Sequence, residues 1–280
     1  MDKNQSAIDP AFSGVISAAI QIPGIKVNRE TFLLDQLKPE TPERSRVLIE
    51  KGPVGAGYPR SELKRLAHKL VNTRTITSSA VSFAAGIPGG LAMAGTVSAD
   101  LVQFYAVALR LAQEIAYLYG EEDLWTSTSP DPKKVNDQLI LYCGVMLGAS
   151  GASQAVRLLS SSLSKQALKK LPQKALMSTL YYPIVKHIAK ALGLRMTKSI
   201  FAKGVSKIIP IVGGVLSGGL TLATMRPMGI RLIDTLDEAH FSYLPANFSA
   251  DWQDVHSIIA QAQAEEHLSP SPEAMDDSVI

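Results

Sequence analysis

The feature of this sequence most able to do chemistry is a long run of cationic side chains with no carboxylate among them. Between Asp137 and Asp234 the chain contains no Asp or Glu, yet it carries thirteen Lys and Arg residues. Subtracting them from the 28 basic residues leaves 15 basic and 25 acidic residues elsewhere, so a segment near +13 adjoins flanks near −10. An unneutralised positive field of this kind attracts polyanions.

Eleven of the thirteen cations lie between residues 157 and 207, on segments with helical periodicity. Ile184, Ile188 and Leu192 alternate with lysines there, a pattern typical of an amphipathic helix at an anionic lipid interface. An ordinary solvated face of lysines is the competing interpretation. The residues that we predict to bind membrane anions are Lys165, Lys169, Lys170, Lys174, Lys186, Lys190, Lys198, Lys203 and Lys207.

Nucleic acid is the other natural partner of a basic field, but the sequence disfavours it. The basic segment has few aromatic residues and almost no clustered arginines. Base stacking and bidentate phosphate contacts would require both. Anionic membrane lipid is therefore the partner that we expect.

The sequence contains no recognisable catalytic, cofactor or metal motif. The five histidines are scattered, and none is spaced from a Cys or another His as metal ligands are. A nucleophile elbow, a phosphate-binding loop and a dinucleotide fingerprint are all missing. The single cysteine, Cys143, lies in an apolar run that favours a buried, inert thiol. We predict no catalytic residue, no cofactor and no metal, while leaving open whether the chain has any enzymatic activity.

One group of polar residues on a helix predicted between residues 100 and 120 could line a ligand pocket. At 100° per residue, Asp100, Gln103, Arg110 and Glu114 share one face of that helix, opposite Phe104, Leu111, Ile115 and Leu118. In the simpler interpretation the helix is half-buried in a core, and Arg110 and Glu114 form an i,i+4 ion pair. In the alternative, the four polar residues contact an apolar ligand bound beside them.

Three long uncharged stretches must position these residues, at 75–99, 138–156 and 208–225. Small residues recur in them at four-residue spacing, which places them on one helix face for close packing. The stretches are consistent with a tightly packed soluble helical core, or with membrane-embedded helices or hairpins. Pro88 and Pro210 favour bends over clean single spans. The predicted helix-packing glycines are Gly86, Gly90, Gly144, Gly148, Gly214 and Gly218.

The remaining segments predict an all-α chain with one helical domain. Residues 1–60 form short helices, one capped by Asn28 and ending near Leu37, the next starting at Thr41 and stopping near Gly52. A helical core containing the basic segment then occupies 61–245, with a solvated loop after the helix-capping Gly120. Residues 246–280 form an acidic helix, for which Asp251 is a plausible cap, and a disordered tail.

Composition bears on where such a protein works. Apolar residues make up 46% of the chain and charged residues only 19%, against about 25% charged in an average soluble protein. One cysteine excludes an internal disulfide, and the polar N-terminus does not resemble a secretory signal. We therefore expect a cytoplasmic protein associated with the cytoplasmic membrane.

Two glycine-rich runs resemble signatures of the EcsC family. The run AAGIPGGLAMAGTVSADLVQFYAVALRLAQEIAYLYG is similar to the central family signature, and IIPIVGGVLSGGLTLATMRPMGIRL is similar to the C-terminal one. IPGIKVNRETFLLDQL resembles the opening of some members, so the resemblance covers roughly residues 20 to 235.

The resemblance implies a bacterial protein, since the family takes its name from an operon component that accompanies an ABC transporter. It supplies no agreed catalytic residues. Related sequences are sometimes labelled tetrapyrrole vinyl reductases, but this chain has no nicotinamide, flavin or iron–sulfur signature.

The sequence thus favours a non-enzymatic accessory or scaffold that binds anionic lipid surfaces, with a transporter or another membrane assembly as a further partner. A soluble helical protein that binds an apolar ligand or lipid between glycine-rich helices is the alternative. A membrane-perturbing effector is a second alternative.

Overall fold

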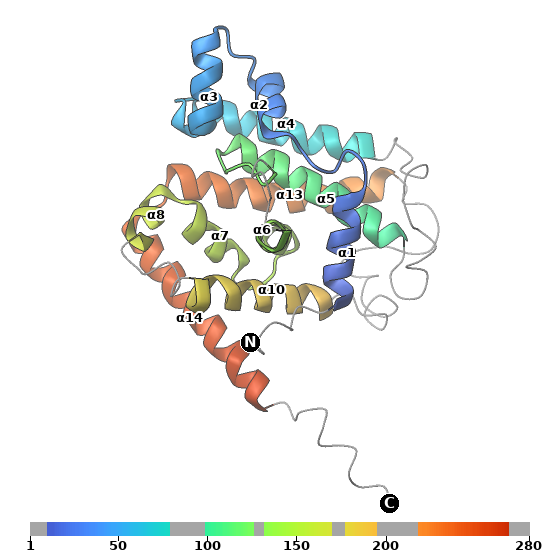
Figure 1. Ribbon diagram of the computed structural model, residues 1–280, viewed down its shortest axis with the longest axis vertical. Helices are drawn as coiled ribbons and strands as arrows, with labels where there is room; N and C mark the ends of the chain where they lie inside the picture. Colours follow the sequence, from blue (N-terminus) through green and yellow to red (C-terminus); the bar gives the residue numbers. More distant parts are fainter. Residues whose placement is uncertain (1–9, 79–98, 126–131, 170–176, 195–217, 269–280) are drawn as a thin grey trace, which may run out of the picture.

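The computed structural model describes residues 10–78, 99–125, 132–169, 177–194 and 218–268, and within these ranges the chain is helical, with no strand (Figure 1). The predicted all-α single domain is confirmed. The elements in chain order are α1 (Pro10–Gln21), α2 (Arg29–Leu37), α3 (Pro42–Gly55), α4 (Arg60–Ser78), α5 (Ala99–Leu118), α6 (Pro132–Leu147), α7 (Ala152–Ser160), α8 (Ser162–Leu168), the π-helical turn η2 (Met177–Tyr181), α10 (Tyr182–Leu194), α13 (Gly218–Phe241) and α14 (Pro245–Leu268).

Helix α6 is the centre of the domain. It contacts α5, α7, α10 and α13, and Figure 1 shows it end-on with α5 and α13 above it and α10 below. Residues 139–146 are all buried. A helix that is apolar on every face is stable when other helices surround it. This position accounts for the lack of charge in α6 from residue 138 to its end.

The uncharged stretch 138–156 is a helix–turn–helix rather than one helix. Helix α6 ends at Leu147, and α7 starts at Ala152 after a turn. Gly148 and Gly151 have φ of 68° and 79° in that turn, a left-handed conformation that only glycine adopts at little cost. Gly148 therefore lies in the turn and not on a helix face with Gly144.

None of the described helices is both long enough and apolar enough to cross a membrane. Of the other two uncharged stretches, the structure describes only the ends, 75–78, 99 and 218–225. Gly218 is the first residue of α13, whereas Gly86, Gly90 and Gly214 lie outside the described residues.

Gly144 allows α6 and α10 to approach closely. A β-carbon at this position would lie 2.6 Å from Cγ2 of Ile188 and 3.1 Å from Cβ of Ala152. These distances are shorter than van der Waals contact, and Gly144 and Ala152 meet across the turn between α6 and α7. The glycine is thus required by the packing of three helices.

The Gly144→Ala substitution is expected to lower the free energy of unfolding by about 2 kcal/mol, because an added methyl group overpacks a filled core. Replacing Ile188 with Leu, which moves the branch from the β-carbon to the γ-carbon, should recover part of the loss. Chemical denaturation of the single and double variants measures both effects. A double variant less stable than Gly144→Ala alone would contradict this account of the contact.

Helices α2 and α3 begin where the sequence predicts, and α2 ends at Leu37 as expected, whereas α3 continues to Gly55. The side chain of Asn28 accepts a hydrogen bond from the backbone N–H of Thr31, and Thr41 accepts one from that of Arg44. Gly52 breaks α3 with φ of 69°. Local side-chain capping of free backbone N–H groups explains both starts.

One hydrophobic core includes residues from α1 to α14, from Val15 to Ile259. Helices α1, α2 and α3 each contact α5, and α14 contacts α7 and α10. The N-terminal helices and the acidic C-terminal helix therefore belong to the same domain as the central helices.

The predicted role of Asp251 as a helix cap is wrong. Helix α14 starts six residues earlier, at Pro245, so Asp251 lies inside the helix, with its side chain buried. Its carboxylate binds Arg157 instead. The sequence shows that an acidic residue precedes an apolar run, but not that the helix has already begun.

The expectation of a solvated loop after Gly120 is also wrong for its first residues. Glu121 is buried, and Leu124 and Trp125 pack against the core. The indole N–H of Trp125 donates to Oε1 of Gln113, 2.8 Å away. A buried amide on α5 thus holds this segment in place.

Candidate anion-binding surface

The described lysines of the basic segment lie on α8, α10 and the residue that follows α8. Lys165, Lys169 and Lys190 are exposed, and Lys186 is partly exposed. We call these four residues the α8/α10 lysines. The other five predicted membrane-binding residues, Lys170, Lys174, Lys198, Lys203 and Lys207, lie outside the described residues.

The apolar face of α10 is not available to a lipid bilayer. Ile184, Ile188 and Leu192 are each exposed by 1% or less, and α10 packs against α6. Returning one such side chain to water costs about 1.5–3 kcal/mol. Insertion of this face into a bilayer would require α10 to leave the core, so any attraction between this helix and a membrane must come from its charged side.

Helix α8 is positioned by a local cap. The hydroxyl of Ser161 accepts a hydrogen bond from the backbone N–H of Ser164, as expected for an N-cap serine. Ser164 and Leu168 are buried, whereas Lys165 and Lys169 point to solvent. The helix thus has a core side and a cationic side.

Acidic residues from outside the basic segment pair with one of its cations, Arg157. Arg157 binds Asp251 through two hydrogen bonds of 2.9 and 2.6 Å, and its Nη1 lies 3.4 Å from a carboxylate oxygen of Glu238. Burial disfavours the charge of Arg157, but the bonds to Asp251 and the nearby carboxylates outweigh it and raise the pKa of Arg157. The positive field is therefore concentrated on the lysines, not on Arg157.

A buried pair that sequence reasoning missed lies beside the cationic segment. Nε2 of His240 on α13 is 3.0 Å from Oε1 of Glu121, and both side chains are largely buried. Burial alone would raise the pKa of Glu121, but the hydrogen bond with His240 and the charge of Lys165 outweigh it and lower that pKa. The sequence offered no signal for this pair, because the two residues are 119 positions apart.

Arg110 and Glu114, two of the four predicted pocket residues, form an ion cluster with Arg74. The carboxylate of Glu114 is fully buried, and it accepts hydrogen bonds from Arg110 on the same helix and from Arg74 on α4. Arg110 also donates to the backbone carbonyl of Gly24. These contacts join α4, α5 and the segment after α1. Asp100 and Gln103 lie on the first turns of α5, and their side chains are outside what the structure describes.

Cys143 is fully buried, as the sequence predicts. Burial raises the pKa of its thiol to about 12, so the thiol stays protonated near neutral pH and is a poor nucleophile. Within the described ranges, no three His, Cys, Asp or Glu side chains are grouped so that they could hold a metal ion.

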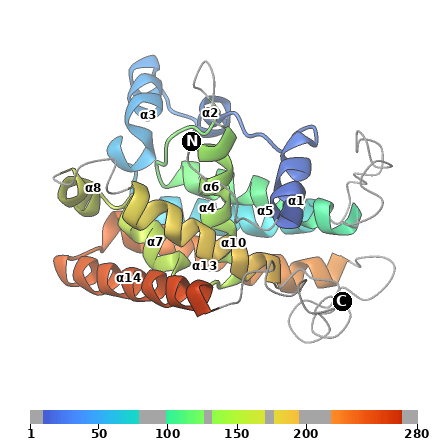
Figure 2. The same ribbon diagram turned by 60° about the horizontal axis from the view of Figure 1, so that its bottom comes forward.

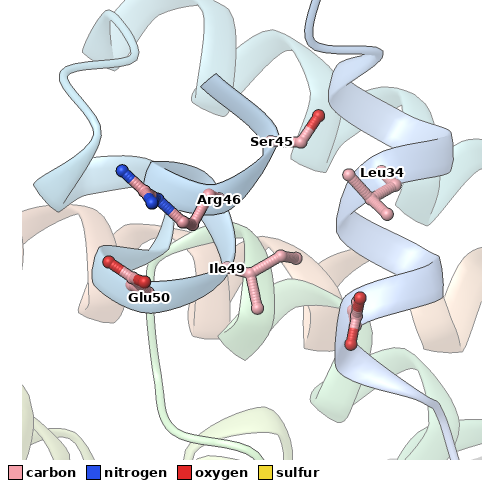
Figure 3. A pocket seen from close by; sticks show the side chains of 6 residues that line it. Leu34, Ser45, Arg46, Ile49 and Glu50 are labelled. Atoms are coloured by element: carbon pink, nitrogen blue, oxygen red, sulfur yellow. The ribbon is translucent and has the colours of Figure 1, made fainter. Parts of the chain in front are cut away.

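A shallow pocket of about 330 Å³ lies between α2 and α3 (Figure 3). Leu34 of α2 lies across it from Ser45, Arg46, Ile49 and Glu50 of α3, and Glu30 completes the lining. Ligand sites are usually enclosed by apolar walls with a few polar groups. This pocket is open and half of its lining is charged, so it offers no enclosed apolar site.

The chain matches no protein-family model, no curated protein and no solved structure. The resemblance to the EcsC family accordingly stays a prediction.

Proposed function

We propose that this protein binds anionic lipid surfaces through the α8/α10 lysines and works as a non-enzymatic accessory or scaffold at the cytoplasmic face of a bacterial membrane. The observation that carries the proposal is the exposure of lysines in a segment of 96 residues without a carboxylate. The EcsC resemblance supports the accessory role, and it suggests a transporter or another membrane assembly as a further partner.

The mode of binding that follows is electrostatic and peripheral. The face of α10 formed by Ile184, Ile188 and Leu192 is buried in the protein core, so it supplies no apolar contact with acyl chains. A lysine near an anionic bilayer contributes about 1 kcal/mol, and salt screens the attraction over a Debye length of about 8–10 Å. Binding should therefore weaken steeply with salt and fail on neutral lipids.

Co-sedimentation with vesicles measures this directly. Wild-type protein should sediment with phosphatidylserine-containing vesicles at low salt and remain in solution with pure phosphatidylcholine vesicles. The double variant Lys165→Gln/Lys169→Gln should bind the anionic vesicles about thirtyfold more weakly, at about 1 kcal/mol for each lysine.

A matched control removes two exposed lysines outside the segment, Lys51 on α3 and Lys69 on α4. The Lys51→Gln/Lys69→Gln variant has the same net charge as the test variant and should retain most of the binding. Equal losses in both variants would show that net charge alone matters. Equal binding of wild type to neutral and anionic vesicles, or tighter binding to duplex DNA at the same salt, would refute the proposal.

A further inference from the structure

The C-terminal part of the chain has a charge opposite to that of the segment it packs on. Residues 246–280 contain seven acidic residues and no Lys or Arg. Helix α14, which begins this part, contacts α7, η2 and α10, all of which belong to the acid-free segment. Figure 2 shows α14 running beside α7 and α10 along one side of the domain. The acidic residues are Asp251, Asp254, Glu265, Glu266, Glu273, Asp276 and Asp277.

An ion pair holds the first half of α14 on the segment. Asp251 is 4% exposed and makes both of its charged hydrogen bonds with Arg157 of α7. Its Oδ2 also accepts a 2.7 Å hydrogen bond from the hydroxyl of Tyr243. This carboxylate neutralises the guanidinium of Arg157, which would otherwise attract an external anion.

Apolar contacts fix the middle of α14 against the same helices. A β-carbon at Gly151, in the turn before α7, would lie 2.9 Å from Cδ1 of Ile258 on α14 and 3.2 Å from Cδ1 of Ile184 on α10. Val255 and Ile259 are buried as well. The helix is therefore seated in one register along α7 and α10.

That register brings the acidic end of α14 toward the lysines of α10. Burial and the charge of Lys190 lower the pKa of His187 on α10, while Glu265 of α14 acts in the opposite direction. Glu265 and Lys190 thus act on the same imidazole, and both side chains are exposed. A carboxylate at this place weakens the field that the α10 lysines present to an external anion.

We propose that α14 is an autoinhibitory cover, whose acidic C-terminal end competes with anionic lipid for the α10 lysines. The inference rests on the proposed function, and it adds the regulation of that surface. Removing the negative charge at the end of α14 should strengthen membrane binding, although no lysine is changed.

The full-length variant Glu265→Gln/Glu266→Gln tests the cover. We expect it to bind phosphatidylserine-containing vesicles three- to tenfold more tightly than wild type at low salt, with the difference disappearing at high salt. Glu265 is exposed, so its replacement should leave the melting temperature close to that of wild type. The matched control is Glu43→Gln/Glu50→Gln on α3, which removes two exposed carboxylates at the opposite end of the domain from α14 (Figure 1).

The outcomes separate this inference from the proposed function. Tighter binding by the α14 variant with little change in the α3 control supports the cover. An equal increase in both variants, or wild-type binding that the α14 variant leaves unchanged, overturns the cover and leaves the lipid-binding proposal standing. An absence of vesicle binding in wild type and α14 variant alike overturns both.

Discussion

Replacing Glu114 with Gln is expected to lower the free energy of unfolding by about 3 kcal/mol, because removal of one partner from a buried ion pair leaves uncompensated charge. The side chain of Glu114 is 0% exposed, and its carboxylate binds two arginines. The hydrogen bonds that Arg74 donates to the two carboxylate oxygens measure 2.6 and 2.8 Å. Gln keeps the size of the side chain but cannot accept from both guanidinium groups as a carboxylate does. For a chain of this length the loss corresponds to a fall in melting temperature of roughly 5 °C.

Calorimetry or chemical denaturation provides the measurement. Glu50→Gln, an exposed residue on α3, is the control and should stay within about 0.5 kcal/mol of wild type. In a double-mutant cycle, adding Arg74→Met to Glu114→Gln should cost less than the sum of the two single changes. Strictly additive losses would show that Arg74 and Glu114 do not stabilise each other.

Replacing Asp251 with Asn should have a similar effect, again about 3 kcal/mol. Arg157 is 17% exposed and would retain only the longer contact with Glu238, whose side chain is 38% exposed. The substitution also removes the charged acceptor of the Tyr243 hydroxyl. Because these bonds fix α14 to α7, backbone amides of α14 should also exchange hydrogen faster.

Asp254 supplies the control on the same helix, since its side chain is exposed. The Asp254→Asn variant makes the same change in net charge and should leave stability and hydrogen exchange close to wild type. Faster exchange spread evenly over all helices of Asp251→Asn, with none concentrated in α14, would contradict the role assigned to this ion pair.

The correct predictions from sequence concern contacts between residues that are close along the chain. Asn28, Thr41 and Gly120 end or begin helices where expected, and Arg110 and Glu114 form the predicted pair. Such contacts span three or four residues, so spacing alone reveals them. Helical periodicity likewise identified the apolar face of α10.

The contacts that organise the candidate surface are between residues distant along the chain. Arg157 and Asp251 are 94 positions apart, and the sequence pattern suggested a capping role for Asp251. Arg74 is 40 positions from Glu114, far beyond the three- or four-residue spacing that predicts an ion pair on one helix. Such pairings depend on which helices pack together and in which register, and no local pattern specifies either.

The all-α character of the chain and its 96 residues with cations but no carboxylate can both be read from the amino-acid sequence. These properties follow from periodicity and composition, which do not depend on the fold. In contrast, it is the packing of the folded chain that turns the apolar face of α10 to α6 and lays an acidic helix against α7 and α10. Burial of a face and neutralisation of a charge are properties of neighbours in space, and folding chooses those neighbours from distant parts of the chain.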